Sequence, residues 1–486
     1  MRKNLLFVLL TLSCLSAIAD NLNDYNVRSF GAVGDGKSLD SPAINNAIES
    51  AFANGGGKII VPAGIYLCGS IHLKSNIELH LLPGAIIKAA PASMKAYDES
   101  ESFGGFPEYQ DGGHTYFHNS LIWAEGQDNI SITGRGMIDG EGLTKKDTEN
   151  AGNVQGGSIG TGDKAIALKL CTNILIRDIT IFRGGHFAII ITGCEKGTID
   201  NVTIDTNRDG IDIDCCKYLT VTNTKVNTPN DDGIVLKSSY ALKKPVPCEN
   251  ILINNCIVTG YKLGTFLDGT YIPEKVNWVC GRIKLGTESN GGYRNIAISN
   301  CTMMDSSGLA FEEVDQGRME NIAVSNITMN HVHHYPIYIT TGCRNRGPKE
   351  VTSPSYGGDI MISNVIADDA DSLAGIIVTG MKEEPLRNIR LHNIQIRYRG
   401  GGTSDLSKKE YREQGTNYPE PRWAGPTPAY GLYARHVDGL TVRGLYLETI
   451  RPDYRHVVIL DDVKNADIQD LTAPVQKGAE KIVIKN

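Results

Sequence analysis

Residues 295–298, NIAI, return as residues 321–324, NIAV, after an interval of 26 residues. Each copy begins with Asn and then alternates apolar side chains with others, which is the period-two pattern of a β-strand. Related stretches lie at 129–132 (NISI), 173–176 (NILI), 250–253 (NILI), 388–391 (NIRL) and 440–442 (LTV). Because a repeat of about 20 to 50 residues is typical of stacked units, we predict an all-β chain that winds as a parallel β-helix.

Other segments complete this prediction. We expect the recurring Asn residues to form a ladder in which side-chain amides bond the backbone of neighbouring coils. Residues 41–53 carry Ala and Ile at helical spacing, which predicts a short N-terminal helix that caps the coil and covers its strand edges. Long irregular stretches at roughly 93–118, 238–280, 342–358 and 400–428 are predicted to be loops that rim the functional face.

The N-terminal segment has the pattern of an export signal. Arg2 and Lys3 precede an apolar run at 5–17 that is too short to span a membrane, and residues 17–19 read Ala-Ile-Ala. We therefore expect residues 1–19 to be removed and residues 20–486 to form one β-helix domain, exported to the periplasm or the cell exterior. A lipid anchor on Cys14 is the less favoured alternative, and no later stretch is long and apolar enough to span a membrane.

Charge and cysteine content narrow the function classes. A net charge of -7 argues against a general nucleic-acid binder, although a few local cations can still hold an acidic substrate. Ten of the eleven cysteines lie beyond the predicted signal and are scattered without metal-ligand spacing. We therefore favour buried, reduced cysteines over a disulfide framework. We expect no cofactor and no metal site, and a monomeric chain.

A second repeat concentrates acidic residues. Residues 207–211 read NRDGI and residues 230–234 read NDDGI, 23 residues later, or about one coil. Residues one coil apart lie about 4.8 Å apart in a parallel β-helix. We therefore expect Asp209 to lie against Asp232 and Asp231 to lie against Arg208. Asp214 falls at the same offset from Lys237, which predicts an ion pair.

Three crowded carboxylates have a chemical consequence. Like charges at this spacing raise one pKa strongly. Glycoside hydrolysis needs such a difference, because one acid must stay protonated while another is ionised to activate water. An Asp column that binds calcium, or one that only stabilises turns, remains an alternative on this pattern.

These motifs and their flanks resemble the polygalacturonase family, glycoside hydrolase family 28. The resemblance begins with residues 30–36 (FGAVGDG) and 62–66 (PAGIY), continues through 134–140 (GRGMIDG) and both Asp motifs, and reaches at least Met329. It implies a right-handed, pectin-lyase-like β-helix in a divergent, bacterial-type member. The implied activity is inverting hydrolysis of α-galacturonosyl linkages in pectin, and the altered motifs and long loops suggest release of end residues.

The resemblance also implies site roles. Asp231 corresponds to the general acid, and Asp209 with Asp232 corresponds to the pair that activates water. Asn207, Arg208, Lys237 and Glu288 are candidate substrate-binding residues, together with Arg282 and Lys284.

Two motifs depart from the family pattern. Cys280-Gly281-Arg282 stands where the family has Gly-His-Gly, and Ala310-Phe311-Glu312 stands where it has Arg-Ile-Lys. We expect Arg282 and Lys284 to bind the substrate carboxylate instead. The alternative is that one of them only balances Glu288 or Glu312.

Weaker candidates and competing functions remain. His186 and the group His331, His333 and His334 lack the usual metal-ligand spacing. Four aromatic residues could stack on sugars or pack in the core: Trp123, Tyr261, Trp278 and Tyr335. The other functions considered are a rhamnogalacturonan hydrolase, a calcium-dependent pectate lyase and a non-catalytic glycan-binding β-helix.

Overall fold

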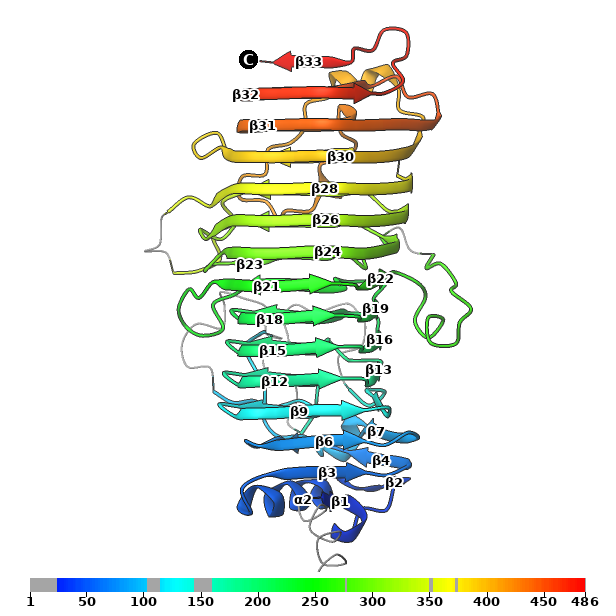
Figure 1. Ribbon diagram of the computed structural model, residues 1–486, viewed down its shortest axis with the longest axis vertical. Coiled ribbons are helices and arrows are strands. Elements are labelled where there is room, and N and C mark those ends of the chain that lie inside the picture. Colours follow the sequence, from blue (N-terminus) through cyan, green and yellow to red (C-terminus); the bar gives the residue numbers. More distant parts are fainter. Residues whose placement is uncertain are drawn as a thin grey trace, which may run out of the picture.

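The computed structural model describes residues 24–102, 114–143, 160–275, 278–348, 353–371 and 375–485. Within them the chain winds as a parallel β-helix, and the strands stack in sequence order along its long axis (Figure 1). The predicted fold is thus confirmed. The predicted signal segment and Cys14 lie outside the described residues.

Three ladders of parallel strand pairs form the walls of the β-helix. The first contains β1 (Asp24–Asn26), β3 (Gly57–Val61), β6 (Ile77–Leu81), β9 (Asp128–Gly134), β12 (Thr172–Arg177), β15 (Glu195–Asp200), β18 (Lys217–Thr222) and β21 (Cys248–Asn254). The second contains β2 (Asp35–Leu39), β4 (Gly64–Cys68), β7 (Ala85–Ala89), β10 (Met137–Asp139), β13 (Thr180–Phe182), β16 (Thr203–Asp205), β19 (Lys225–Asn227) and β22 (Ile257–Thr259).

The third ladder, here called the site ladder, carries the Asp motifs. It contains β5 (Ile71–His72), β8 (Ile122–Glu125), β11 (Lys164–Lys169), β14 (Phe187–Thr192), β17 (Asp209–Asp214), β20 (Ile234–Ser238), β23 (Ile283–Ser289), β25 (Leu309–Glu313), β27 (Ile337–Thr341) and β29 (Ile376–Thr379). It continues through part of β31 (Ala429–Arg451) and β32 (His456–Thr472) to β33 (Ile482–Lys485).

Longer strands join the first two walls in the C-terminal half. They are β24 (Tyr293–Ser306), β26 (Arg318–Val332), β28 (Tyr356–Ala370) and β30 (Leu386–Gly400). Ile296 pairs with Ile322 and Ile298 with Val324, so the alternation recognised in the sequence places these side chains in one continuous core.

The Asn ladder differs from the prediction in its bonding. The Asn321 side-chain amide donates to the Asn295 side-chain oxygen at 2.6 Å, and Asn295 donates to Asn250 at 2.9 Å. The Asn side chains therefore form hydrogen bonds with one another rather than with the backbone of the neighbouring coil. Asn295 and Asn321 have φ near 56° and 58°, a left-handed conformation that Asn tolerates better than most residues.

The end cap and the loops largely follow the sequence. Helix α2 (Ser41–Ala53) lies at the N-terminal end beside β1 and β3, and buries Ile44, Ala47 and Ile48 (Figure 1). The segment 401–428 is a loop with two short 3-10 helices, η7 (Ser404–Lys408) and η8 (Pro421–Trp423). The stretch 238–280 is not one irregular loop, because β21 and β22 lie within it and complete another coil.

The ten described cysteines are all free, and nine of them are buried. The backbone N–H of Cys171 donates to Cys194 Sγ at 3.2 Å, and that of Cys194 donates to Cys216 Sγ at 3.3 Å. The cysteines thus stack along the core, as predicted for reduced thiols. None of the described helices has the length and apolarity that crossing a membrane requires.

Candidate active site

The two Asp motifs stack as predicted. Ile211 pairs with Ile234, which confirms the offset of 23 residues, and the Gly210 N–H donates to the Asp232 carbonyl at 2.9 Å. The Arg208 guanidinium lies 2.8 Å from the Asp231 carboxylate. One coil therefore brings Asp209, Asp231 and Asp232 into a single cluster.

The glycines of these motifs serve close packing rather than a turn. Gly210 and Gly233 are absent from the residues with positive φ. A Cβ on Gly210 would lie 2.4 Å from the Gly233 carbonyl oxygen, and one on Gly233 would lie 2.4 Å from Val258. Only glycine lets the coils approach this closely beneath the carboxylates.

The predicted ion pair between Asp214 and Lys237 is wrong, although the two residues do align. Lys237 Nζ lies 3.1 Å from Asp212 and 3.7 Å from Glu288. Asp214 accepts instead from the Ser239 N–H at 2.7 Å and from its hydroxyl at 2.6 Å. The Ser239 donors occupy Asp214, and the flexible Lys237 side chain reaches Asp212 on the same strand as Asp214.

Arg282 and Lys284 on β23 hold Asp232 from both sides. Arg282 Nε donates to Asp232 Oδ1 at 2.5 Å, and Lys284 Nζ lies 3.3 Å from Oδ2. Arg282 also contacts Glu420 at 2.8 Å, and Lys284 contacts Glu312 at 3.4 Å. Lys284 therefore contacts Glu312, one of the carboxylates that the alternative interpretation named, in addition to Asp232.

The pKa values of two stacked carboxyls move in opposite directions. Burial, and then the charges of Asp231 and Asp212, raise the pKa of Asp209 well above its usual range. Burial acts in the same direction on Asp232, but Arg282, Lys284 and Lys237 outweigh it and hold its pKa below the usual range. The shifts thus favour the neutral form of Asp209 and the ionised form of Asp232. Asp231 is the most exposed of the three, with 24% of its side chain accessible.

A bulge in β23 places Glu288 among cations. The register between β20 and β23 shifts between Leu236 and Ser238, which pair with Leu285 and Ser289. Burial would raise the pKa of Glu288, but Lys237 and Arg344 hold it well below its usual range. Arg344 lies 3.5 Å and Arg346 3.6 Å from Glu288.

Several site residues have no motif in the sequence. Glu420 and Tyr418 come from the loop 401–428, and Tyr418 contacts Thr287 at 3.0 Å. Tyr335, which the sequence marked only as a sugar-stacking or core residue, accepts from Arg282 at 2.6 Å and is fully buried. The loop itself was predicted to rim the functional face, but no signal identified which of its side chains enter the site.

The other sequence candidates lie in separate contacts. The Asn230 side-chain amide donates to that of Asn207. Trp278 packs against His334 and the guanidinium of Arg422, whose carbon lies 3.4 Å from the ring centroid. Further contacts join Trp123 to His118, Tyr261 to Tyr271, His186 to Phe187, His331 to Asp369 and His333 to Asp305.

One group of described residues has metal-ligand geometry. Potential ligand atoms of Asp231, Asp232 and Cys280 lie within 4.8 Å of one another. Asp232 already contacts Arg282 and Lys284, and burial raises the pKa of the Cys280 thiol well above its usual range, which keeps it protonated. A protonated thiol is a poor ligand. The chemistry of this group therefore does not favour a calcium site.

Comparison with known proteins gives consistent matches. Residues 86–261 match Glycosyl hydrolases family 28. The chain is 24% identical over 335 residues to a probable polygalacturonase of Vitis vinifera, and 23% identical over 406 residues to an exo-poly-alpha-D-galacturonosidase of Dickeya chrysanthemi. These alignments cover 65% and 73% of this chain, but only 62% and 64% of the two relatives.

A solved structure agrees on the fold. The family 28 exopolygalacturonase of Yersinia enterocolitica superposes with a TM-score of 0.68 at 19% identity, covering 91% of this chain and 78% of that one. The family match, the order of the motifs and the shared β-helix agree with one another. Over residues 86–261 the chain is therefore similar to the glycoside hydrolases of family 28, and its β-helix fold agrees with that similarity.

Proposed function

We propose that this protein hydrolyses α-galacturonosyl linkages in pectin with inversion of configuration. The observation that carries the proposal is the stacked Asp cluster, in which Asp209 and Asp232 have pKa values shifted in opposite directions. Polygalacturonases and an exo-poly-alpha-D-galacturonosidase among the relatives support the substrate class. From the pattern of residues 1–19 we also infer export, and we propose that the enzyme acts as a monomer.

In this mechanism the ionised Asp232 takes a proton from water while the water oxygen attacks the anomeric carbon. The protonated Asp209 hydrogen-bonds and orients that water. Asp231 donates its proton to the glycosidic oxygen as the carbon–oxygen bond breaks. Exchange with solvent then returns the proton from Asp232 and reprotonates Asp231.

The Arg208–Asp231 ion pair has to open for this donation. While the Arg208 guanidinium lies 2.8 Å away, the Asp231 carboxylate is engaged as an acceptor and is not available to the glycosidic oxygen. A uronate carboxylate on the substrate would compete for Arg208, because Arg binds carboxylates through the same fork of donors. We propose that substrate binding draws Arg208 away and makes Asp231 available to the glycosidic oxygen.

The contacts of Arg282 and Lys284 favour a second candidate substrate. Each cation already contacts a second protein carboxylate besides Asp232, Glu420 for Arg282 and Glu312 for Lys284. This arrangement leaves less positive charge for a substrate carboxylate and favours a neutral sugar beside them. A rhamnogalacturonan backbone, in which uronate and neutral sugars alternate, is therefore the alternative substrate.

The test is digestion of polygalacturonate and rhamnogalacturonan in chelator, following reducing ends and the ultraviolet absorbance of unsaturated products. Hydrolysis gives reducing ends without absorbance, and product sizing separates end-residue release from mid-chain cutting. Absorbance that requires calcium would replace the proposal with a lyase. No product from either polymer would indicate a binding protein.

A matched pair of variants assigns the proton donor. Asp231→Asn removes the proposed acid and should lower kcat by about 10²- to 10⁴-fold. Asp24→Asn makes the same change at an exposed position in β1 and should retain full activity. Equal activity of the two variants would refute the role of Asp231.

A further inference from the structure

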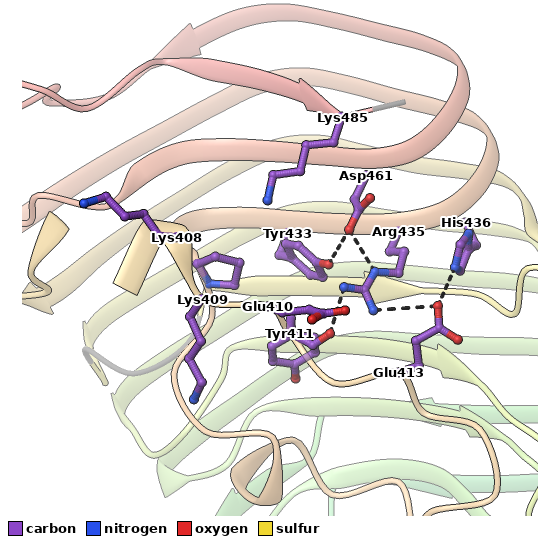
Figure 2. A pocket seen from close by; sticks show the side chains of 11 residues that line it. Lys408, Lys409, Glu410, Tyr411, Glu413, Tyr433, Arg435, His436, Asp461 and Lys485 are labelled. Carbon is purple, nitrogen blue, oxygen red and sulfur yellow. Dashed lines mark hydrogen bonds and ion pairs between the residues drawn. The ribbon is translucent and has the colours of Figure 1, made fainter. Parts of the chain in front are cut away.

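A cavity of about 350 Å³ lies on the site ladder near the C-terminal end of the β-helix. Figure 2 shows the side chains that line it. Ligand sites typically have volumes of about 300 to 1,000 Å³. Strands β31, β32 and β33 and the loop 401–428 enclose it. Its lining includes three lysines and three carboxylates: Lys408, Lys409, Lys485, Glu410, Glu413 and Asp461.

The floor of this cavity is held by hydrogen bonds. Asp461 accepts from the Tyr433 hydroxyl at 2.9 Å and from Arg435 Nε at 3.0 Å. Arg435 also donates to the Tyr411 carbonyl at 2.8 Å, and only 7% of its surface is exposed (Figure 2). The floor is therefore formed before any ligand arrives, which lowers the entropic cost of binding.

Three lysines surround the opening. Lys408 lies 3.4 Å from Asp405, with both side chains more than three-quarters exposed, so the pair is weak. Lys409 donates to the Ala424 carbonyl at 3.3 Å. Lys485 has no ion-pair partner among the residues that the structure describes, and Figure 2 shows its side chain directed toward Tyr433. The rim thus offers three lysine ammonium groups, of which only Lys408 has an ion-pair partner within the described part of the chain.

This combination indicates the chemistry of the ligand. Lysine ammonium groups bind a carboxylate as point charges. Glu413 already contacts His436, and Asp461 already accepts from Tyr433 and Arg435, but each carboxylate, like that of Glu410, has a further oxygen that can accept from a ligand hydroxyl. These carboxylates would repel a ligand that carries only anionic oxygens. An acidic sugar presents a carboxylate and several hydroxyls together. The lining therefore fits a uronate residue better than phosphate or a neutral sugar.

The cavity and the candidate active site share a face and a loop. Four strand spacings separate β23 from β31 along the site ladder, which is roughly 19 Å. The loop 401–428 supplies Tyr418 and Glu420 to the active site, and Lys408 and Lys409 to the cavity. A polysaccharide lying along this face can therefore reach both places.

We propose that this cavity is a distal binding site for uronate residues of the polysaccharide whose other end occupies the active site. The inference rests on the proposed function for its substrate. It assigns to the C-terminal coils a role in holding the polymer, separate from bond cleavage. Binding at two linked positions on one chain increases affinity without a new contact at the cleavage site.

The experiment compares two triple variants by affinity electrophoresis in gels that contain polygalacturonate or neutral galactan. Lys408→Gln, Lys409→Gln and Lys485→Gln remove the rim charges. Lys464→Gln, Lys477→Gln and Lys481→Gln remove the same charge from exposed positions nearby that do not line the cavity. Equal thermal midpoints establish that both variants fold.

We expect the rim variant to bind polygalacturonate roughly fivefold more weakly than the control variant, as three modest charge contacts imply. Its KM for the polymer should rise by a similar factor. Equal retardation of both variants, or no retardation of the wild-type chain by polygalacturonate, would overturn the distal site. Failure of the wild type to cleave any pectic polymer would instead overturn the proposed function, and the retardation would still decide the distal site.

Discussion

Ionisation of Glu312 should make the stability of the protein depend on pH. Its side chain is fully buried, lies 3.4 Å from Lys284 Nζ and accepts from the Thr287 hydroxyl at 3.1 Å. Burial raises its pKa from 4.5 to about 7, against the opposing charges of Lys284 and Arg282. Because the folded state then binds its proton more tightly than the unfolded state, this carboxyl destabilises the fold as pH rises from about 4.5 to 7 and adds no further change above that range.

The substitution Glu312→Gln should remove this dependence. Gln keeps the size and a hydrogen-bonding oxygen but does not ionise. From the shift to about 7, wild type should lose about 2 to 3 kcal/mol more unfolding free energy than the variant between pH 5 and pH 8. The assay is denaturant unfolding of both proteins across that range.

An exposed matched change, Glu195→Gln, provides the control, because a solvated carboxyl should leave the wild-type pH dependence unchanged. Parallel curves for wild type and Glu312→Gln would refute the reasoning. That result would mean that Lys284 and Arg282 keep Glu312 ionised throughout the range.

Three further predictions follow from buried contacts. Arg282→Met leaves two buried carboxylates without their guanidinium and should cost about 3 to 5 kcal/mol of unfolding free energy, whereas the exposed Arg318→Met should cost about 0 to 1 kcal/mol. Asn321→Ala loses the side-chain hydrogen bond to Asn295 and keeps a positive φ that is unfavourable for Ala, so it should cost about 1 to 3 kcal/mol of unfolding free energy. Asn321→Gly should cost less, because Gly adopts a positive φ without strain. Timed maleimide labelling with peptide mapping should modify Cys343 first among the described cysteines, because it is the one that is not buried.

The fold was predictable because its determinants are local and repeat. Alternation around Ile296 and Ile322 sets the strands, and the interval between copies sets the coil, so each strand pairing follows from counting residues. The same counting placed Asp231 beside Arg208. It failed for Lys237, because register aligns backbones and does not decide which acceptor a long side chain reaches.

The remaining contacts of the site join residues that do not recur at a regular interval in the sequence. Arg282 lies 50 residues from Asp232 and 138 residues from Glu420, yet it bridges the two carboxylates. The first contact follows from neighbouring coils, but the second requires the path of an irregular loop, which no alternation or spacing encodes.

This dependence has a chemical consequence. Asp232 can remain ionised in a buried position only while Arg282 and Lys284 stay beside it, and those cations are in turn held by Glu420 and Glu312. Replacing Glu420 with Gln removes the negative charge beside Arg282 Nη1, which also donates to Tyr335, and leaves the Nε contact with Asp232. Glu420→Gln should therefore lower kcat less than a change to Asp232 itself, and should increase affinity for a substrate carboxylate that Arg282 could then bind. Steady-state kinetics on polygalacturonate and rhamnogalacturonan separate these effects. A lower KM for polygalacturonate alone would identify Glu420 as the residue that excludes a uronate from this position. An unchanged ratio of the KM values for the two polymers would show that Arg282 serves only to hold Asp232.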